Sequence, residues 1–210
     1  MIMFIVVVVG SYLLGSIPFG YLIGRMAGID IRKVGSCNIG ATNVVRVLGK
    51  RYGYTVFLLD FLKGFSAVKL SMFLAMRLVP GWNSPDWPEL LGITAAISSV
   101  VGHSYPLWLK FQGGKGVATS AGALFALTAI GGLIGLGIWI VIFWLTRYVS
   151  VASVTAALLL PIVILAITWR DERPKALFYF SLCAAAFVIW RHRSNLSRLM
   201  HGTESRFTRK

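Results

Sequence analysis

The sequence has few charged residues, and acidic residues are the scarcest of them. Only 7 of the 210 residues are Asp or Glu, and all charged residues together make up 13%, against about 25% in a soluble domain. Hydrophobic residues reach 57%, and the mean hydropathy is +0.75. One soluble core cannot hide this much apolar surface, and intrinsic disorder requires the opposite composition. We therefore expect an all-α integral membrane protein.

Motifs for metal binding and covalent catalysis are also missing. The two cysteines, Cys37 and Cys183, lie far apart without metal-ligand or CxxC spacing, so we expect neither a disulfide nor a metal site. The sequence has no serine nucleophile elbow, and Trp108 rather than an acid stands five residues after His103. Composition and motifs together predict no metal site and no nucleic-acid partner.

The net charge of +14 has two explanations, which the composition leaves open. Lys and Arg accumulate in the cytoplasmic loops of membrane proteins and so set their orientation. The same cations also bind phosphates and anionic lipid headgroups.

Six apolar stretches follow one another along the chain. The 30 residues 117–146 carry no charge and form either one long helix or two short ones that break near Gly131 and Gly132. Two crossings there leave the basic stretch 25–51 and the basic tail on the same side, as the positive-inside rule requires. We therefore predict a single domain, residues 1–210, with about seven transmembrane helices, the N-terminus outside and the C-terminus cytoplasmic. The predicted spans cover residues 2–24, 54–79, 90–109, 117–146 (twice), 150–169 and 176–190, and the first is expected to be retained rather than cleaved as a signal.

Small polar residues gather in the stretch 35–46, on the predicted cytoplasmic side. Glycines such as Gly40 allow backbone N–H groups to form an anion nest. Thr42 or Asn43 is a candidate helix cap, and helix N-termini attract phosphate. Arg46 follows on the same helical face and offers a bidentate fork for phosphate. The alternative is a solvated polar loop.

A second such stretch runs from Gly102 to Gly116. Glycines at 113, 114 and 116 allow the backbone to approach a ligand, and Lys115 supplies a point cation, although the spacing is not that of a Walker A loop. His103 is expected about 10 Å inside the helix end. It is either a ligand-binding residue or a structural histidine that is hydrogen-bonded across the bundle.

Two further groups of polar residues have both a structural and a functional interpretation. Asp60 and Lys63 are three residues apart on one predicted helix, so they either lock helices together or mark a functional site. Residues 191–195, with His192, Arg193 and Asn195, form either a positive flank of the last span or part of a ligand site.

These residues together resemble a bacterial membrane family, the acyl-phosphate–glycerol-3-phosphate acyltransferases of the PlsY type. One departure is Cys37, where the family usually has glycine, and a positive φ at that position would strain cysteine. The stretches that carry the resemblance are residues 15–20, 35–46, 60–64, 102–106, 113–119 and 191–195.

The resemblance implies transfer of a fatty acyl group from acyl phosphate to the 1-hydroxyl of glycerol 3-phosphate. The products are lysophosphatidic acid and inorganic phosphate, in the first acylation of phospholipid synthesis at the bacterial inner membrane, with the site facing the cytoplasm. It implies no cofactor, and it implies membrane lipids as partners. The residues expected to hold the phosphates are Ser36, Asn38, Arg46, Lys115, His192 and Asn195. Those expected to line the substrate site are Gly40, Thr42, Asn43, His103, Gly113, Gly114, Gly116 and Arg193.

Other functions and two proton acceptors stay open. A small basic membrane protein can transport phosphorylated metabolites, although the sequence shows no paired inverted halves, or it can bind lipid headgroups without catalysis. For an acyltransferase, either the donor's own phosphate or a histidine, His103 or His192, can remove the hydroxyl proton.

Overall fold

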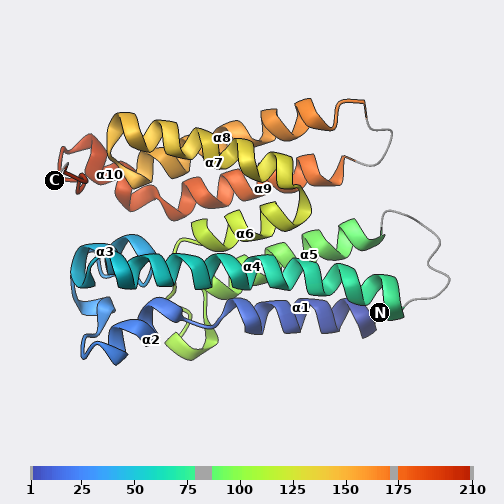
Figure 1. The fold of residues 1–210 in the computed structure, drawn as a ribbon, viewed down its shortest axis with the longest axis horizontal. Coiled ribbons are helices and arrows are strands. Elements are labelled where there is room, and N and C mark those ends of the chain that lie inside the picture. The colour runs from blue at the N-terminus through green and yellow to red at the C-terminus, as the bar shows by residue number, and fades with distance from the viewer. Residues whose placement is uncertain (1, 79–86, 171–174, 209–210) are drawn as a thin grey trace. The chain divides into compact units, whose positions relative to one another are not determined.

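The computed structural model describes residues 2–78, 87–170 and 175–208, and every regular element within them is a helix (Figure 1). This confirms the all-α prediction. The chain forms two compact units, Met1–Leu127 and Thr128–Lys210. Most of the predicted outer loop 80–89 and most of the charged turn 170–175 lie outside the described residues. The two units are described in turn.

The first predicted span is interrupted in the structure. Helix α1 covers Ile2–Gly15, and α2 covers Phe19–Met26. Pro18 separates them because proline has no N–H for the helical hydrogen-bond ladder and its ring clashes with the preceding turn. The short helix η1 (Ile31–Lys33) and α3 (Ala41–Leu48) follow, and the long α4 covers Lys50–Leu78.

The third predicted span is shorter than expected. Helix α5 covers Trp87–Ser104 and ends there, because Pro106 disfavours helical geometry at the residue before it. The short helix η2 (Leu107–Leu109) lies between α5 and α6 (Val117–Leu127). The sequence had suggested that His103 lies well inside the helix. In the structure it lies in the last turn of α5.

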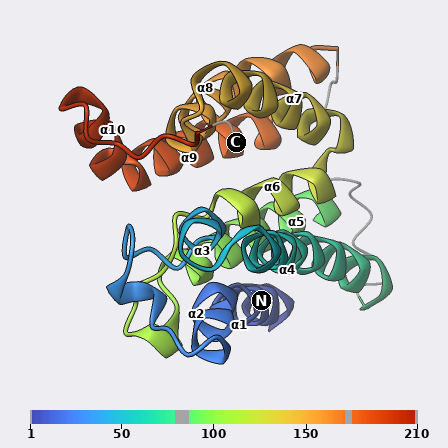
Figure 2. The same cartoon turned by 60° about the vertical axis from the view of Figure 1, so that its left-hand side comes forward.

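Glycines allow the helices of the first unit to pack closely, with α5 against α1 and α4, and α6 against α4 (Figure 2). A Cβ on Gly15 would overlap the Ser99 carbonyl of α5. Between α4 and α6 the close approach occurs twice, where Gly64 meets the Thr119 carbonyl and Gly122 meets the Phe61 carbonyl. Small residues at such contacts bring backbones together, as in other membrane helix pairs.

The second unit begins at the break in the charge-free run. Helix α7 covers Ala129–Thr146, and the Thr128 hydroxyl caps it by accepting a hydrogen bond from the Gly131 N–H. The charge-free run therefore forms two helices, as predicted. The break lies at Thr128, slightly before Gly131, because the threonine caps the start of α7. The remaining helices are α8 (Val149–Ile167), α9 (Ala176–Arg191) and α10 (Arg193–Met200).

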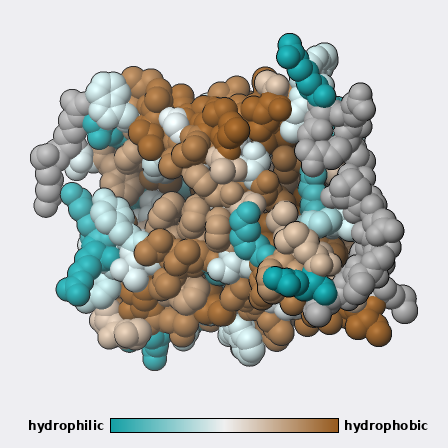
Figure 3. All heavy atoms as spheres, turned by 45° about the vertical axis from the view of Figure 1, so that its right-hand side comes forward, coloured by the Kyte–Doolittle hydropathy of each residue, from teal (hydrophilic) through white to brown (hydrophobic). Residues whose placement is uncertain are grey.

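Many apolar side chains lie on the outside of these helices. Leu133, Trp144 and Ile162 are about 60% exposed, and hydrophobic side chains cover most of the face drawn in Figure 3. Among the described residues, four helical stretches are long and apolar enough to cross a membrane: Ile2–Met26, Trp87–Leu109, Ala129–Thr146 and Val149–Ile167. Val117–Leu127 and Ala176–Arg191 are apolar but shorter, while α4 is long but carries charges. Exposed apolar helices of this kind identify a membrane protein, and the number of seven spans stays a prediction.

The close contact between α4 and α6 predicts that Gly64→Ala destabilises the protein. Its new Cβ would overlap the Thr119 carbonyl, and such overpacking costs about 1–3 kcal/mol. Gly10→Ala is the matched control, because no atom lies within 4 Å of the added Cβ. Unfolding by SDS in mixed micelles measures both variants, and equal stability would contradict this packing.

Candidate functional site

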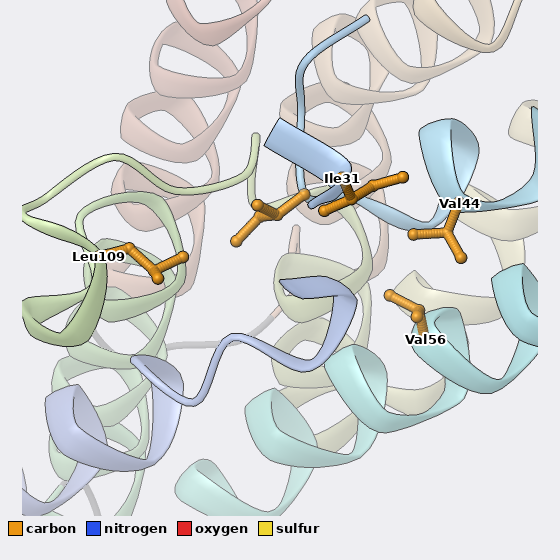
Figure 4. Packing of buried hydrophobic residues seen from close by; sticks show 5 residues of the cluster. Ile31, Val44, Val56 and Leu109 are labelled. Atoms are coloured by element: carbon orange, nitrogen blue, oxygen red, sulfur yellow. The ribbon is translucent and has the colours of Figure 1, made fainter. Parts of the chain in front are cut away.

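Five buried apolar side chains join the two polar stretches of the first unit. Ile31, Ile39 and Val44 come from the segment around α3, Val56 comes from α4, and Leu109 comes from η2 (Figure 4). All five are less than 7% exposed. Because Leu109 belongs to the second polar stretch, this cluster holds residues 35–46 and 102–116 on one common core.

The Asn43 side chain organises the first polar stretch. Its Oδ1 accepts a hydrogen bond from the Ser36 N–H at 2.8 Å. Its Nδ2 lies 2.9–3.2 Å from the carbonyl oxygens of Ile31, Val34 and Asn38. Asn43 is 1% exposed, so its amide faces the loop that it holds. Its predicted contact with substrate stays a prediction.

The caps and backbone of this stretch differ from the expectation. Gly40 and not Thr42 or Asn43 is the N-cap of α3, so the predicted side-chain cap is wrong. The Gly40 N–H instead donates to Asn38 Oδ1 at 2.8 Å, which makes a local turn rather than an open anion nest. Cys37 has a φ of 57°, the left-handed geometry that its replacement of glycine had suggested.

The polar and cationic residues of the two stretches reach the surface to different degrees. Ser36 is exposed, and Asn38, Arg46 and Lys115 are half-buried. Half-buried cations keep access to a ligand while the protein limits their motion. Nearby, hydrogen bonds from Arg32 lower the pKa of Asp30 to about 2, so this carboxylate stays ionised and pairs with Arg32.

The glycine-rich loop is seated on the end of α5. The Gly113 N–H donates to the Ser104 carbonyl at 3.2 Å, and the Gly114 N–H donates to the His103 carbonyl at 3.1 Å. A Cβ on Gly114 would overlap the His103 ring at Nε2. Gly116 has a φ of 80° and turns the chain into α6. The close approach that glycine permits here is therefore to α5.

The predicted residues of the C-terminal region belong to the second unit and lie where α9 meets α10. His192 is 3% exposed, and its Nδ1 lies 2.8 Å from the Val188 carbonyl oxygen. Since a carbonyl only accepts, this bond places a proton on Nδ1. Asn195 is 7% exposed, and Arg193 is exposed.

Glu204, which the sequence analysis did not single out, contacts the candidate site residue Asn195. Its Oε1 accepts from Asn195 Nδ2 at 2.6 Å and from Ser150 Oγ at 3.1 Å, and its Oε2 pairs with Arg198 Nε at 2.8 Å. Burial raises the pKa of the Glu204 carboxyl, but these hydrogen bonds outweigh burial and leave the pKa below its usual range. The only sequence signal was one acid in a strongly basic tail.

Metal ligands do not gather in the part of the chain that the structure describes. Across residues 2–78, 87–170 and 175–208, no group of three His, Cys, Asp or Glu side chains is placed to hold an ion.

The central place of Asn43 predicts that Asn43→Ala loosens residues 31–40. The substitution leaves the Ser36 N–H and several carbonyls without partners, at about 1–3 kcal/mol for each buried group. We expect the Ser36 amide to exchange hydrogen at least about tenfold faster, with amides in the middle of α5 unchanged. Asn38→Ala removes only the bond from Gly40 and should have a smaller effect. Unchanged exchange at Ser36 would contradict the role of Asn43.

Known proteins are similar to this chain over nearly its whole length. The family model for glycerol-3-phosphate acyltransferase matches residues 5–202. Glycerol-3-phosphate acyltransferase from Desulforamulus reducens is 42% identical over 98% of this chain and 96% of its own. The enzyme of that name from Aquifex aeolicus is also 42% identical, over 95% of this chain and 97% of its own.

Two crystal structures of PlsY, an integral membrane glycerol 3-phosphate acyltransferase, have the same fold and are 40% identical to the chain. The glycerol 3-phosphate form has a TM-score of 0.82, covering 98% of this chain and 96% of that one. The lysophosphatidic acid form has a TM-score of 0.80, covering 98% and 95%. The chain therefore belongs to the glycerol-3-phosphate acyltransferase family of integral membrane proteins.

Proposed function

We propose that the protein transfers a fatty acyl group from acyl phosphate to the 1-hydroxyl of glycerol 3-phosphate. The products are lysophosphatidic acid and inorganic phosphate. Support comes from the family and from the two PlsY structures, one in a glycerol 3-phosphate form and one in a lysophosphatidic acid form. The observation that carries most weight is the apolar cluster shared by the two polar stretches, of which one contains Arg46 and the other Lys115.

The residues suit two substrates that both carry phosphate. Arg46 offers a planar fork for two phosphate oxygens, and Lys115 offers a point charge. Ser36 and Asn38 add a hydroxyl and an amide on the same segment as Arg46. By the family resemblance, His192 and Asn195 supply further polar contacts to the phosphates.

The reaction needs no covalent enzyme nucleophile, because acyl phosphate is an activated mixed anhydride. The glycerol 1-hydroxyl oxygen attacks the acyl carbon and forms the ester C–O bond. The bond between the acyl carbon and the phosphate oxygen breaks, and phosphate leaves with the electron pair. The hydroxyl proton passes to the donor's own phosphate. The protein then contributes position and positive charge.

The membrane supplies the route for the acyl chain. Apolar helices place the protein in the bilayer, where an acyl tail dissolves while its phosphate stays at the polar boundary. The Lys and Arg of residues 25–51 favour a cytoplasmic location for the polar stretches 35–46 and 102–116. On this basis we place the enzyme in the bacterial inner membrane with its substrates reaching it from the cytoplasm.

Phosphate release from palmitoyl phosphate tests the proposal. Purified protein should release phosphate and form lysophosphatidic acid only when glycerol 3-phosphate is present. Arg46→Ala should lower kcat/KM by about 10²–10³, because it removes a cation that stabilises the phosphates. Arg77→Ala, which removes an exposed cation at the far end of α4, should behave like the unmodified protein. No release from folded, lipid-supplemented protein would contradict the proposal and would favour the transporter.

The pH profile of kcat distinguishes the two proton acceptors. A histidine base loses activity as it is protonated, near pH 6.5 for an unperturbed ring, and this acidic limb disappears when the responsible histidine is replaced. If the donor's phosphate accepts the proton, both His103→Ala and His192→Gln should keep the limb of the unmodified enzyme at saturating substrates. If either variant loses the acidic limb, the replaced histidine is the acceptor of the hydroxyl proton.

A further inference from the structure

Three ionisable side chains of the first unit are almost completely buried and have no part in the reaction as proposed. Asp60 is 2% exposed, Lys63 is 3% exposed and His103 is 4% exposed. Burying charges costs several kcal/mol per ion unless they are paired and hydrogen-bonded. Such groups within membrane proteins are usually functional. Their contacts show what they hold.

The three side chains connect separate elements through one carboxylate. Lys63 Nζ lies 2.8 Å from Asp60 Oδ1 and donates to the Ile17 carbonyl at 2.8 Å. The Ile17 carbonyl belongs to the break between α1 and α2. From α5, His103 Nδ1 lies 3.5 Å from the same Asp60 Oδ1. Asp60 therefore links α4 to the last turn of α5, and Lys63 links α4 to the break after α1.

The opposite edge of the His103 ring faces the glycine-rich loop. Its Nε2 faces Gly114 so closely that a Cβ there would overlap the ring. The main chain of the same histidine accepts from the Gly114 N–H. Lys115 is the next residue. A rotation of the His103 ring toward the loop would therefore press on Gly114, and so on the backbone that carries the Lys115 cation.

We propose that Asp60, Lys63 and His103 form a positioning network for the phosphate-binding loop. The Asp60 carboxylate, whose Oδ1 lies 3.5 Å from Nδ1, favours one orientation of the His103 ring, and the ring supports Gly114 and sets the place of Lys115. Lys63 compensates the buried carboxylate. None of the three touches the reacting atoms. The proposal rests on the proposed function for the identity of the loop's ligand, and a 1 Å misplacement of such a loop can cost about 10²-fold in rate.

A pair of double variants isolates the acceptor at position 60. Replacing Asp60 alone would leave Lys63 as an uncompensated buried charge, which is strongly destabilising. Asp60→Asn with Lys63→Met, and Asp60→Leu with Lys63→Met, both remove the ion pair and keep similar volumes. They differ in one respect, since only asparagine retains an oxygen that can accept from His103 Nδ1.

We expect the leucine variant to have a KM for palmitoyl phosphate or for glycerol 3-phosphate at least tenfold above that of the asparagine variant, with a smaller change in kcat. Inorganic phosphate serves as a second probe, because its binding raises the unfolding temperature. The quantity measured is the phosphate concentration that gives half of the maximal rise in unfolding temperature. That concentration should rise by a similar factor in the leucine variant. If both variants fold and have the same KM and the same half-saturating phosphate concentration, the network is wrong. It is also wrong if the loss of substrate and phosphate binding simply parallels the fall in unfolding temperature.

The two proposals fail in different ways. If unmodified protein releases no phosphate from palmitoyl phosphate but the two variants still differ in phosphate binding, the donor assignment is wrong and the network stands. If the leucine variant does not fold, a double-mutant cycle of His103→Ala and Gly114→Ala tests the same contact, read as phosphate half-saturation. A positioning contact gives non-additive effects, whereas additive effects would overturn it.

Discussion

The apolar cluster of Ile31, Ile39, Val44, Val56 and Leu109 is the contact on which the rest of the first unit's polar surface depends. The two polar stretches are more than fifty residues apart in the chain and have little regular structure of their own. Neither can be rigid by itself, because glycine-rich backbone loses much entropy when it is ordered. Burying one side chain from η2 with others from η1, α3 and α4 gives both stretches the same foundation.

Two buried polar side chains of the first unit, Asn43 and Lys63, find partners within the protein. The Asn43 amide takes up loop carbonyls and the Ser36 N–H, while Lys63 reaches both Asp60 and the Ile17 carbonyl. In a membrane protein no water in the bilayer core can replace such partners. The polar residues therefore also specify one backbone arrangement, since alternative arrangements would leave these groups unpaired.

The proposed reaction accounts for the lack of a nucleophile motif in the sequence. If the donor is an acyl phosphate, as proposed, it already carries the free energy for acyl transfer, and the protein has only to hold two phosphates and a hydroxyl in place. Such a task requires fixed cations and rigid loops. A chain with 7 acids and 21 Lys or Arg provides the positive field for anionic substrates. In the second unit, Glu204 is the acid that organises Asn195 and Arg198.

Composition and long apolar stretches determined the all-α membrane class, and the polar stretches in their order along the chain were sufficient to indicate the family, because both are properties of the local sequence. The helix break at residues 16–18 was not foreseen, since an apolar run hides a proline effect whose outcome depends on neighbouring helices. The break in the charge-free run was foreseen, but the threonine cap at Thr128 places it slightly before Gly131. The positive φ at Cys37 could be anticipated from the expected glycine. Only the tertiary structure decided that His103 lies beneath Gly114, that Asn43 turns inward, and that Glu204 meets Asn195, because each contact joins residues whose distance in space does not follow from their spacing in the chain.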